Sequence, residues 1–125
     1  MEVLSSRVLL RPSDLDRSIF FYGTTLGLPI YRDFGEGDER GVVFFIGGGF
    51  LEVSGTSAAD SGRIELWLQV RDLAASHREL QRAGVVVLEP PRRRPWGLDE
   101  MWIADPDGTR IAVIEVPPEH PLRHR

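Results

Sequence analysis

The sequence predicts an α+β domain made of two βαβββ modules, whose curved mixed sheets surround a cleft and whose helices lie on the outside. Strand-sized apolar segments and one amphipathic helix follow in the same order in each half. Four residues also recur 58 positions apart, as Leu10 and Leu68, Asp14 and Asp72, Leu15 and Leu73, and Ser18 and Ser76, which indicates a duplicated unit. We expect a single domain over residues 1–125, with module one at 1–55, a small polar linker at 56–63, module two at 64–117 and a tail at 118–125.

The first module begins with a strand at residues 8–10, followed by a helix. Asp14 is the expected N-cap, because its carboxylate can accept hydrogen bonds from the unpaired amides of the first helical turn. Gly27 supplies a stop after apolar residues with helical spacing, namely Leu15, Ile19, Tyr22 and Leu26. Glycine-rich turns then separate three expected strands, at residues 30–34, 42–46 and 50–54.

The second module repeats this order. A strand is expected at residues 64–70, and Asp72 is the expected cap of a helix that ends near Gly84. A short strand at 85–88 and a long loop at 89–98 follow. Two further strands, at 101–104 and 110–116, are joined by the turn Asp105-Pro106-Asp107-Gly108.

Strand periodicity separates the side chains that pack on the helices from those that face the cleft, because successive side chains point to opposite faces of a sheet. The apolar set of each strand is expected to pack against the helix of its module: Val8, Leu10, Leu51, Val53, Ile64, Leu66, Leu68, Val70, Ile111 and Val113. The opposite set is expected in the cleft: Arg7, Leu9, Arg11, Phe50, Glu52, Ser54, Glu65, Trp67, Gln69, Arg110, Ala112 and Ile114. Either Phe44 or Phe45 joins it, depending on the register of that strand.

Composition excludes several classes of function. The chain has no cysteine, so disulfides, thiolate metal sites and a cysteine nucleophile are excluded, and a reducing cytoplasm is the expected location. A net charge of -4 disfavours nucleic acid, and the arginine run at 92–94 is expected to be a solvated loop. No signal peptide and no membrane-spanning run is visible. His77, His120 and His124 are expected to be surface or helix-packing residues.

Two groups of motifs carry a family resemblance. The stretch 14–18, with Phe21-Tyr22 and Leu26-Gly27-Leu28 after it, resembles the first-helix signature of the vicinal oxygen chelate superfamily of glyoxalases, bleomycin-resistance proteins and extradiol dioxygenases. Pro95-Trp96-Gly97 and the turn at 105–108 resemble the late-loop and last-turn signatures of that family. The resemblance spans roughly residues 5 to 117, nearly the whole chain.

The resemblance implies four metal-ligand positions on the first, fourth, fifth and eighth strands, and these fall on Arg7, Glu52, Glu65 and Ala112. Arginine is a cation and alanine has no donor atom. Glu65 stands where a histidine is usual, so only Glu52 matches. We therefore expect no metal and no cofactor, because two carboxylates without an imidazole make a poor transition-metal site. Arg7 is expected to take the place of the dication and to bridge Glu52 and Glu65.

The favoured function is metal-independent binding of a small molecule, either a drug or an aromatic metabolite, without turnover. Apolar walls with a few polar groups are typical of small-molecule pockets, and tryptophan favours flat aromatic ligands. Trp96 lies in a proline- and arginine-rich segment and is the best candidate for a lid over the ligand. The expected ligand-binding residues are Arg7, Leu9, Arg11, Phe50, Glu52, Ser54, Glu65, Trp67, Gln69, Trp96, Trp102, Ala112 and Ile114. A homodimer is implied by the resemblance.

Two alternatives remain open at this stage. The first is a lyase, isomerase or dioxygenase-like enzyme that uses Glu52 or Glu65 as a general base or as a metal ligand. The second is an interaction or regulatory domain with a vestigial pocket. The sequence does not identify the ligand, nor whether the cleft forms within one chain or across a dimer.

Overall fold

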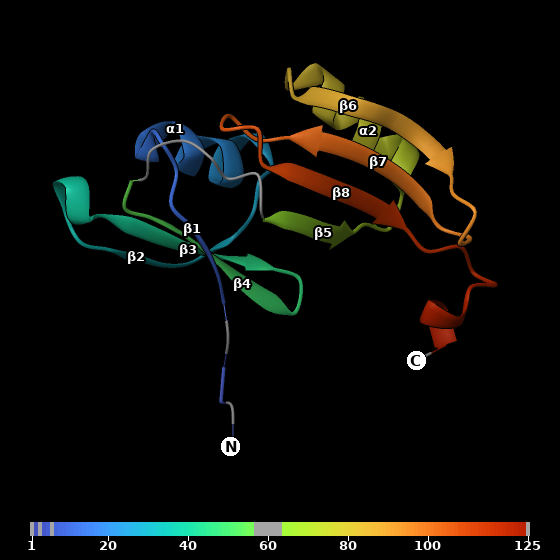
Figure 1. Cartoon of the computed structure of the whole chain (residues 1–125), viewed down its shortest axis with the longest axis horizontal. Helices are drawn as coiled ribbons and strands as arrows, with labels where there is room; N and C mark the ends of the chain where they lie inside the picture. The colour runs from blue at the N-terminus through green and yellow to red at the C-terminus, as the bar shows by residue number, and fades with distance from the viewer. Residues whose placement is uncertain (1, 3, 6, 57–63, 125) are drawn as a thin grey trace. The chain divides into compact units, whose positions relative to one another are not determined.

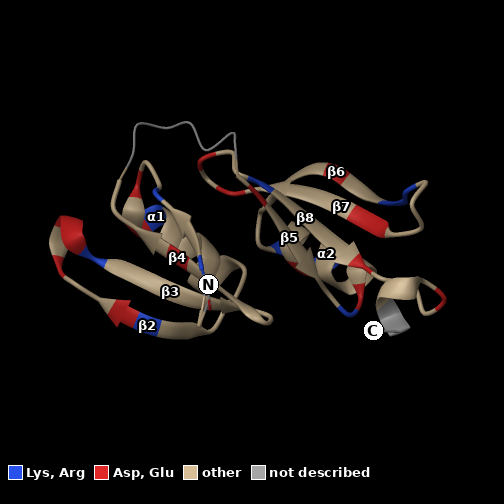
Figure 2. Cartoon of the chain, turned by 60° about the horizontal axis from the view of Figure 1, so that its bottom comes forward, with Lys and Arg blue, Asp and Glu red and all other residues tan. Residues whose placement is uncertain are grey.

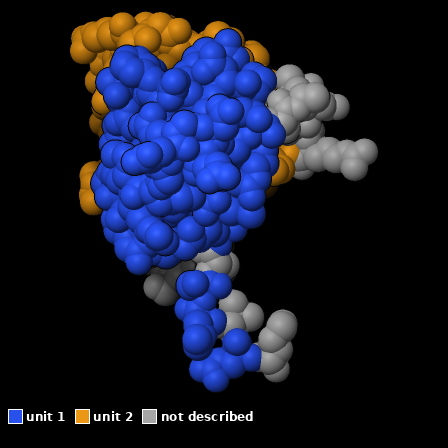
Figure 3. All heavy atoms as spheres, turned by 90° about the vertical axis from the view of Figure 1, so that its left-hand side faces the viewer, with its two compact units in different colours: residues 1–63 blue, residues 64–125 orange. Residues whose placement is uncertain are grey.

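The chain divides into two compact units, unit 1 at residues 1–63 and unit 2 at residues 64–125 (Figure 3). The computed structural model describes residues 2, 4, 5, 7–56 and 64–124. All but residue 56 of the linker predicted at 56–63 lies outside the described residues. Each unit has its own four-stranded sheet and its own helix, and each is described by itself (Figure 1).

Unit 1 contains a mixed sheet in the order β1-β4-β3-β2. The strands are β1 (Val8–Leu10), β2 (Ile30–Phe34), β3 (Gly41–Ile46) and β4 (Gly49–Ser54). β1 runs parallel to β4, whereas the β2–β3 and β3–β4 pairs are antiparallel. Helix α1 (Leu15–Phe20) connects β1 to β2 and contacts β4, and a short 3-10 helix, η2 (Gly37–Glu39), joins β2 to β3.

Unit 2 repeats this topology in the order β5-β8-β7-β6. The strands are β5 (Glu65–Gln69), β6 (Val86–Arg93), β7 (Asp99–Ala104) and β8 (Arg110–Glu115). β5 runs parallel to β8, and the other two pairs are antiparallel. Helix α2 (Leu73–Arg82) lies across one face of β6, β7 and β8 (Figure 1). The predicted α+β fold of two βαβββ modules is confirmed.

Both helices begin at the predicted aspartate. Asp14 accepts from the Arg17 amide and Asp72 from the Ala75 amide, both at 3.0 Å. The helices differ after their first turns. α2 is regular over ten residues, whereas α1 has six and continues as the π-helix η1 (Phe21–Thr25) before Gly27 ends it at φ +72°. No helix in the described ranges is both long enough and apolar enough to span a membrane.

Part of the core of each unit lies between its sheet and its helix. The residues predicted to pack on the helix are buried in β4, at Leu51 and Val53, and in β8, at Ile111 and Val113. Phe44 is also fully buried, and its ring lies 6.4 Å from that of Tyr22 at the start of η1. In β4 burial alternates as predicted from Phe50 to Val53, whereas in β8 all four residues from Ile111 to Ile114 are buried, so burial does not separate the two faces of that strand.

The loop predicted at residues 89–98 is wrong. β6 continues through Pro90 and Pro91 to Arg93, and only the tight turn at 94–98 remains between β6 and β7. β6 is an edge strand with two register shifts. An edge strand tolerates proline because one side of its backbone has no neighbouring strand, so a missing N–H on that side breaks no hydrogen bond of the sheet. The arginine run at 92–94 is therefore the end of a strand and the start of a turn.

Candidate functional site

The predicted site residues fall on both units. In unit 1 they lie on or beside β1 and β4: Arg7, Leu9, Arg11, Phe50, Glu52 and Ser54. In unit 2 they lie on β5, on β7, on β8 and in the β6–β7 turn: Glu65, Trp67, Gln69, Trp96, Trp102, Ala112 and Ile114. Their assembly into one cleft remains a prediction, so the geometry is built for each unit in turn.

Glu52 lies at the centre of a charged cluster in unit 1. Arg7 Nη1 is 2.9 Å from Glu52 Oε1, and Arg11 Nη1 is 3.3 Å from Oε2. The Ser54 hydroxyl donates to Oε2 at 2.7 Å and itself accepts from Arg11. Only 14% of the Glu52 side chain is exposed. Two guanidinium groups and a hydroxyl therefore neutralise and bind this carboxylate.

These contacts lower the pKa of Glu52 below its ordinary value. The hydrogen bond from Ser54 is the largest cause, Arg7 and Arg11 act in the same direction, and burial opposes them. A general base at neutral pH needs a carboxyl pKa that is raised toward the operating pH. The environment of Glu52 shifts its pKa in the opposite direction, so this carboxylate is better suited to an ion cluster than to proton transfer.

An aromatic patch lies beside this cluster in unit 1. The rings of Tyr31, Phe45 and Phe50 contact one another, with centroids 4.8–5.5 Å apart. Phe45 pairs with Phe50 across β3 and β4, whereas Phe44 belongs to the core, which resolves the two alternatives left open by the sequence. Sequence reasoning missed Tyr31, because a register shift in β2 interrupts the alternation from which its face would be predicted.

Glu65 is paired with an arginine of its own unit. Its Oε2 is 3.1 Å from Arg110 Nε, and the two residues are register partners on β5 and β8. The Arg110 guanidinium also lies 4.8 Å from the centroid of the Trp102 ring. Of the predicted bridge, the contact between Arg7 and Glu52 is present. The contact between Arg7 and Glu65 would join the two units, and it stays a prediction.

A hydrophobic cluster lies on the face of the unit 2 sheet that carries the predicted site residues. Ala112, Ile114 and Val116 are almost completely buried, Leu98 is 7% exposed, and Trp102 packs against them. Trp102 Nε1 is buried and has no hydrogen-bond partner in the described part of the chain. Trp67, the register partner of Ala112, is 51% exposed. The predicted face therefore has a packed floor with one open indole beside it.

Trp96 occupies the β6–β7 turn and is held by two charged neighbours. Its Nε1 donates to Glu100 Oε2, and the Arg94 guanidinium lies 5.2 Å from its ring centroid. Glu100 is only 6% exposed, whereas Trp96 remains 55% exposed. Figure 2 shows the mixed charge of this hairpin as a basic segment at the end of β6 and an acidic band on β7. Sequence reasoning found Trp96 but missed Glu100, although Glu100 and Trp102 are two apart on β7 and so share a face.

The donor set does not fit the divalent metal that the family pattern implies. Among the described residues no three His, Cys, Asp or Glu side chains are grouped so that they could hold a metal ion. Glu52 is bound by Arg7 and Arg11, and Glu65 is bound by Arg110. The remaining position, Ala112, has no donor. Carboxylates that are already bound by guanidinium groups are poor metal ligands.

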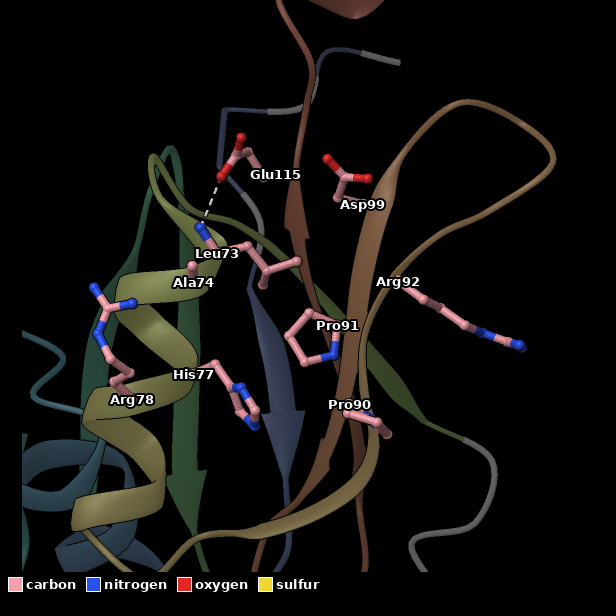
Figure 4. A pocket seen from close by; sticks show the side chains of 9 residues that line it. All are labelled: Leu73, Ala74, His77, Arg78, Pro90, Pro91, Arg92, Asp99 and Glu115. Atoms are coloured by element: carbon pink, nitrogen blue, oxygen red, sulfur yellow. Dashed lines mark hydrogen bonds between the residues drawn. The ribbon is translucent and has the colours of Figure 1, made fainter.

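Two grooves lie away from the predicted site residues. In unit 2 a groove of about 670 Å³ separates α2 from β6, and Figure 4 shows His77 directed toward Pro91 across it. Glu115 at one end accepts from the Leu73 amide at 2.8 Å, so this carboxylate caps α2. A groove of similar volume in unit 1 borders α1, where Arg40 pairs with Asp16 at 3.1 Å. The carboxylate of Glu115 and the ion pair of Arg40 with Asp16 therefore already take part in contacts that stabilise the fold.

Comparison with known proteins identifies the family. A family model described as the Glyoxalase/Bleomycin resistance protein/Dioxygenase superfamily matches residues 5–113. The chain belongs to this superfamily. The resemblance predicted from the helix and turn motifs is thereby confirmed. No sequence among the curated proteins matches this superfamily member.

Solved structures share the fold of this superfamily member. A superfamily protein from Sphaerobacter thermophilus DSM 20745 is 24% identical, with a TM-score of 0.74 over 91% of this chain and 98% of that chain. TnmS3, an antibiotic binding protein from Streptomyces sp. CB03234, is 23% identical, with a TM-score of 0.78 over 93% and 98%. TioX from Micromonospora sp. ML1 is 19% identical, with a TM-score of 0.72 over 90% and 95%. At these identities the likeness concerns the fold alone.

Proposed function

We propose that this protein binds and sequesters an aromatic small molecule, a drug or a metabolite, without a metal ion. The observation that carries the proposal is the pairing of the carboxylates at two family metal positions with arginine, Glu52 with Arg7 and Arg11 and Glu65 with Arg110. Guanidinium groups satisfy the carboxylates through charge-assisted hydrogen bonds. The predicted cleft then offers side-chain surfaces that bind a ligand, and it offers no metal ion that could act as a Lewis acid.

The exposed aromatic side chains support an aromatic ligand. Trp67 and Trp96 in unit 2, and Tyr31 and Phe45 in unit 1, leave much of their surface open. Flat ligands stack on such rings, and aromatic pairs contribute about 0.5–1.5 kcal/mol beyond the burial of area. Trp102 Nε1 is a buried donor without a hydrogen-bond partner among the described residues, whereas Arg94 Nε lies 3.6 Å from Glu100 Oε1 in an ion pair. A donor such as Trp102 Nε1 suits a ligand that carries an acceptor oxygen.

The fold is compatible with this use. TnmS3, which shares it, is an antibiotic binding protein. The lowered pKa of Glu52 weakens the alternative in which this residue is a general base. We also propose that the protein is a cytoplasmic homodimer, in line with the family resemblance and with the lack of cysteine. Light scattering on the purified protein measures the oligomeric state.

The test is a thermal-shift screen against three chemically different probes, namely metal-free bleomycin, a phenazine and an anthraquinone. At least one probe is expected to raise Tm and to quench tryptophan fluorescence. Trp96→Ala and Trp67→Ala are each expected to weaken its binding by about threefold to tenfold. Phe20→Ala is the matched control, because Phe20 is an exposed aromatic residue on α1 outside the predicted site.

Three outcomes contradict the proposal in different ways. If no probe shifts Tm, the chain is better described as an interaction domain. If a bound probe is chemically changed, the chain is an enzyme. If nickel or zinc is retained in stoichiometric amount after dialysis and Glu52→Ala abolishes the retention, the carboxylates do serve a metal.

A further inference from the structure

The C-terminal segment, residues 116–122, turns back onto the β6–β7 turn. Val116 and Pro117 are buried, and the His120 amide donates to the Pro117 carbonyl at 3.0 Å. The His120 imidazole then reaches the turn, where its Nε2 is 3.1 Å from the carbonyl oxygen of Trp96. The sequence predicted His120 to be an ordinary surface residue, so this contact is new. The side chain of His124 lies outside the described residues.

Both ring nitrogens of His120 have defined partners. Nδ1 accepts from the Leu122 amide at 3.2 Å, so in the neutral ring the proton is on Nε2. Nε2 is therefore the donor to the Trp96 carbonyl. Hydrogen bonds at both ring nitrogens hold the imidazole of His120 in one orientation. The C-terminal segment is therefore held at a fixed distance from the turn.

Gly97 makes this close approach possible. Its φ of +89° is a conformation that other residues rarely adopt. A Cβ at this position would lie 3.1 Å from Cδ2 of His120 and 3.7 Å from its Nε2. Any side chain here would therefore crowd the imidazole as well as strain the backbone.

Trp96 is thus held from two sides. His120 binds its backbone, while Glu100 binds its indole Nε1 and the Arg94 guanidinium lies over its ring. The residue nevertheless stays more than half exposed. A large aromatic ring that is fixed in orientation but left open has the properties of a preformed stacking surface.

We propose that His120 is a positioning residue, which holds Trp96 in the orientation needed to stack on an aromatic ligand. The inference rests on the proposed function, because it assigns Trp96 to the ligand site. Ordering a side chain in advance removes part of the entropic cost of binding. Loss of His120 should therefore weaken ligand binding about threefold to tenfold without removing any group that touches the ligand.

The test compares the three indole N–H signals of the full chain by ¹⁵N NMR, with Trp96→Phe used to assign the signal of Trp96. His120→Ala is expected to shift the Trp96 signal and to speed its hydrogen exchange, while the Trp67 and Trp102 signals keep their positions. His120→Gln is expected to restore much of the wild-type signal, because its amide can donate to the same carbonyl. Binding of the best probe from the thermal-shift screen should follow the same order.

A matched pair of glycine variants separates crowding from backbone strain. Gly97→Ala should reproduce the effect of His120→Ala on the Trp96 signal. Gly108→Ala should leave it in place, since Gly108 has a similar φ of +84° but no atom within 4 Å of the added Cβ. Adding Gly97→Ala to His120→Ala should change the Trp96 signal less than Gly97→Ala changes it in the wild type, because the crowded ring is gone and only the backbone strain remains.

The outcomes distinguish this inference from the proposed function. If His120→Ala leaves the Trp96 signal and its exchange unchanged, His120 does not position Trp96, whatever the protein binds. If the signal shifts but probe affinity stays at the wild-type value, the ligand role of Trp96 is wrong. If no probe binds the wild-type protein, the proposed function fails, and the Trp96 signal still reports whether the His120 contact exists.

Discussion

Arginine partners decide the chemistry of the two carboxylates at the family metal positions. Alternation placed Glu52 and Glu65 on the predicted site faces, and charge complementarity predicted Arg7 as the partner of Glu52, but the pairing of Glu65 with Arg110 was not predicted. Arg110 meets Glu65 because β5 and β8 pair in parallel with these residues in register. That register depends on contacts between strands far apart in the sequence. The sequence therefore predicted the candidate residues and the pair of Arg7 with Glu52, but it did not predict Arg11 as a partner of Glu52 or Arg110 as the partner of Glu65.

The lowered pKa of Glu52 predicts a pH-dependent contribution to stability. The unfolded-state pKa of glutamate is about 4.3, and the folded-state pKa of Glu52 lies below its ordinary value. The stabilisation is therefore fully present above the unfolded pKa and is lost as pH falls through the folded pKa. Glu52→Gln should lower the free energy of unfolding by about 1 kcal/mol at pH 7, since both arginines are partly solvated.

Urea denaturation of wild type and Glu52→Gln from pH 7 down to pH 3 measures this contribution. The difference between the two proteins should shrink toward zero at the acid end. Asp16→Asn is a suitable control, because Asp16 belongs to an exposed ion pair with Arg40. A difference that stays constant with pH would mean that the charge of Glu52 contributes nothing to stability.

At the scale of elements, the sequence predicted strands and caps well and irregular backbone poorly. Both N-caps were found because a cap is local, with donor and acceptor three residues apart. The π-helix after Phe20 was missed, since the apolar spacing of residues 15–26 also suits an ordinary helix. The extension of β6 through Pro90 and Pro91 was missed because its stability depends on pairing with β7 at the sheet edge.

The duplicated N-caps predict matched losses of stability. Asp14→Ala and Asp72→Ala should each cost about 1 kcal/mol, because each removes the acceptor of a 3.0 Å bond to a first-turn amide. Asp14→Asn and Asp72→Asn should recover most of the loss, as the amide oxygen can still accept. Differential scanning calorimetry of the four variants checks this, and asparagine variants as unstable as the alanine variants would show that capping is not the cause.

At the scale of the whole molecule, the family assignment rests on the order of elements rather than on any one motif. The sequence predicted only a tail at 118–125 with His120 as a surface or helix-packing residue, yet His120 contacts the turn that carries Trp96. No local sequence pattern predicts this contact, because the contact requires the chain to turn back after β8. The predicted assembly of both units into one cleft is likewise a non-local property, and it can be tested by introducing histidines at the metal-ligand positions that the resemblance implies.

Introducing imidazole at two positions should create a metal site if the implied ligand positions converge. Arg7→His/Glu65→His together with the native Glu52 supplies two histidines and one carboxylate, a set that binds divalent transition metals. We expect the double variant to retain about one nickel ion per subunit after dialysis, and the wild type to retain none. Adding Glu52→Gln should abolish the retention.

The same substitutions show which chains form the cleft. Arg7→His and Glu65→His chains, each first shown by dialysis to retain no nickel by itself, are mixed after unfolding and refolded together. If the cleft forms across a dimer, the Arg7→His site of one chain lies beside the Glu65→His site of its partner, and the mixture gains nickel. If the cleft forms within one chain, no molecule in the mixture has both histidines at one site, and nickel stays unbound. A double variant that also fails to bind nickel would mean that these positions do not converge in either arrangement, which would overturn the predicted cleft itself.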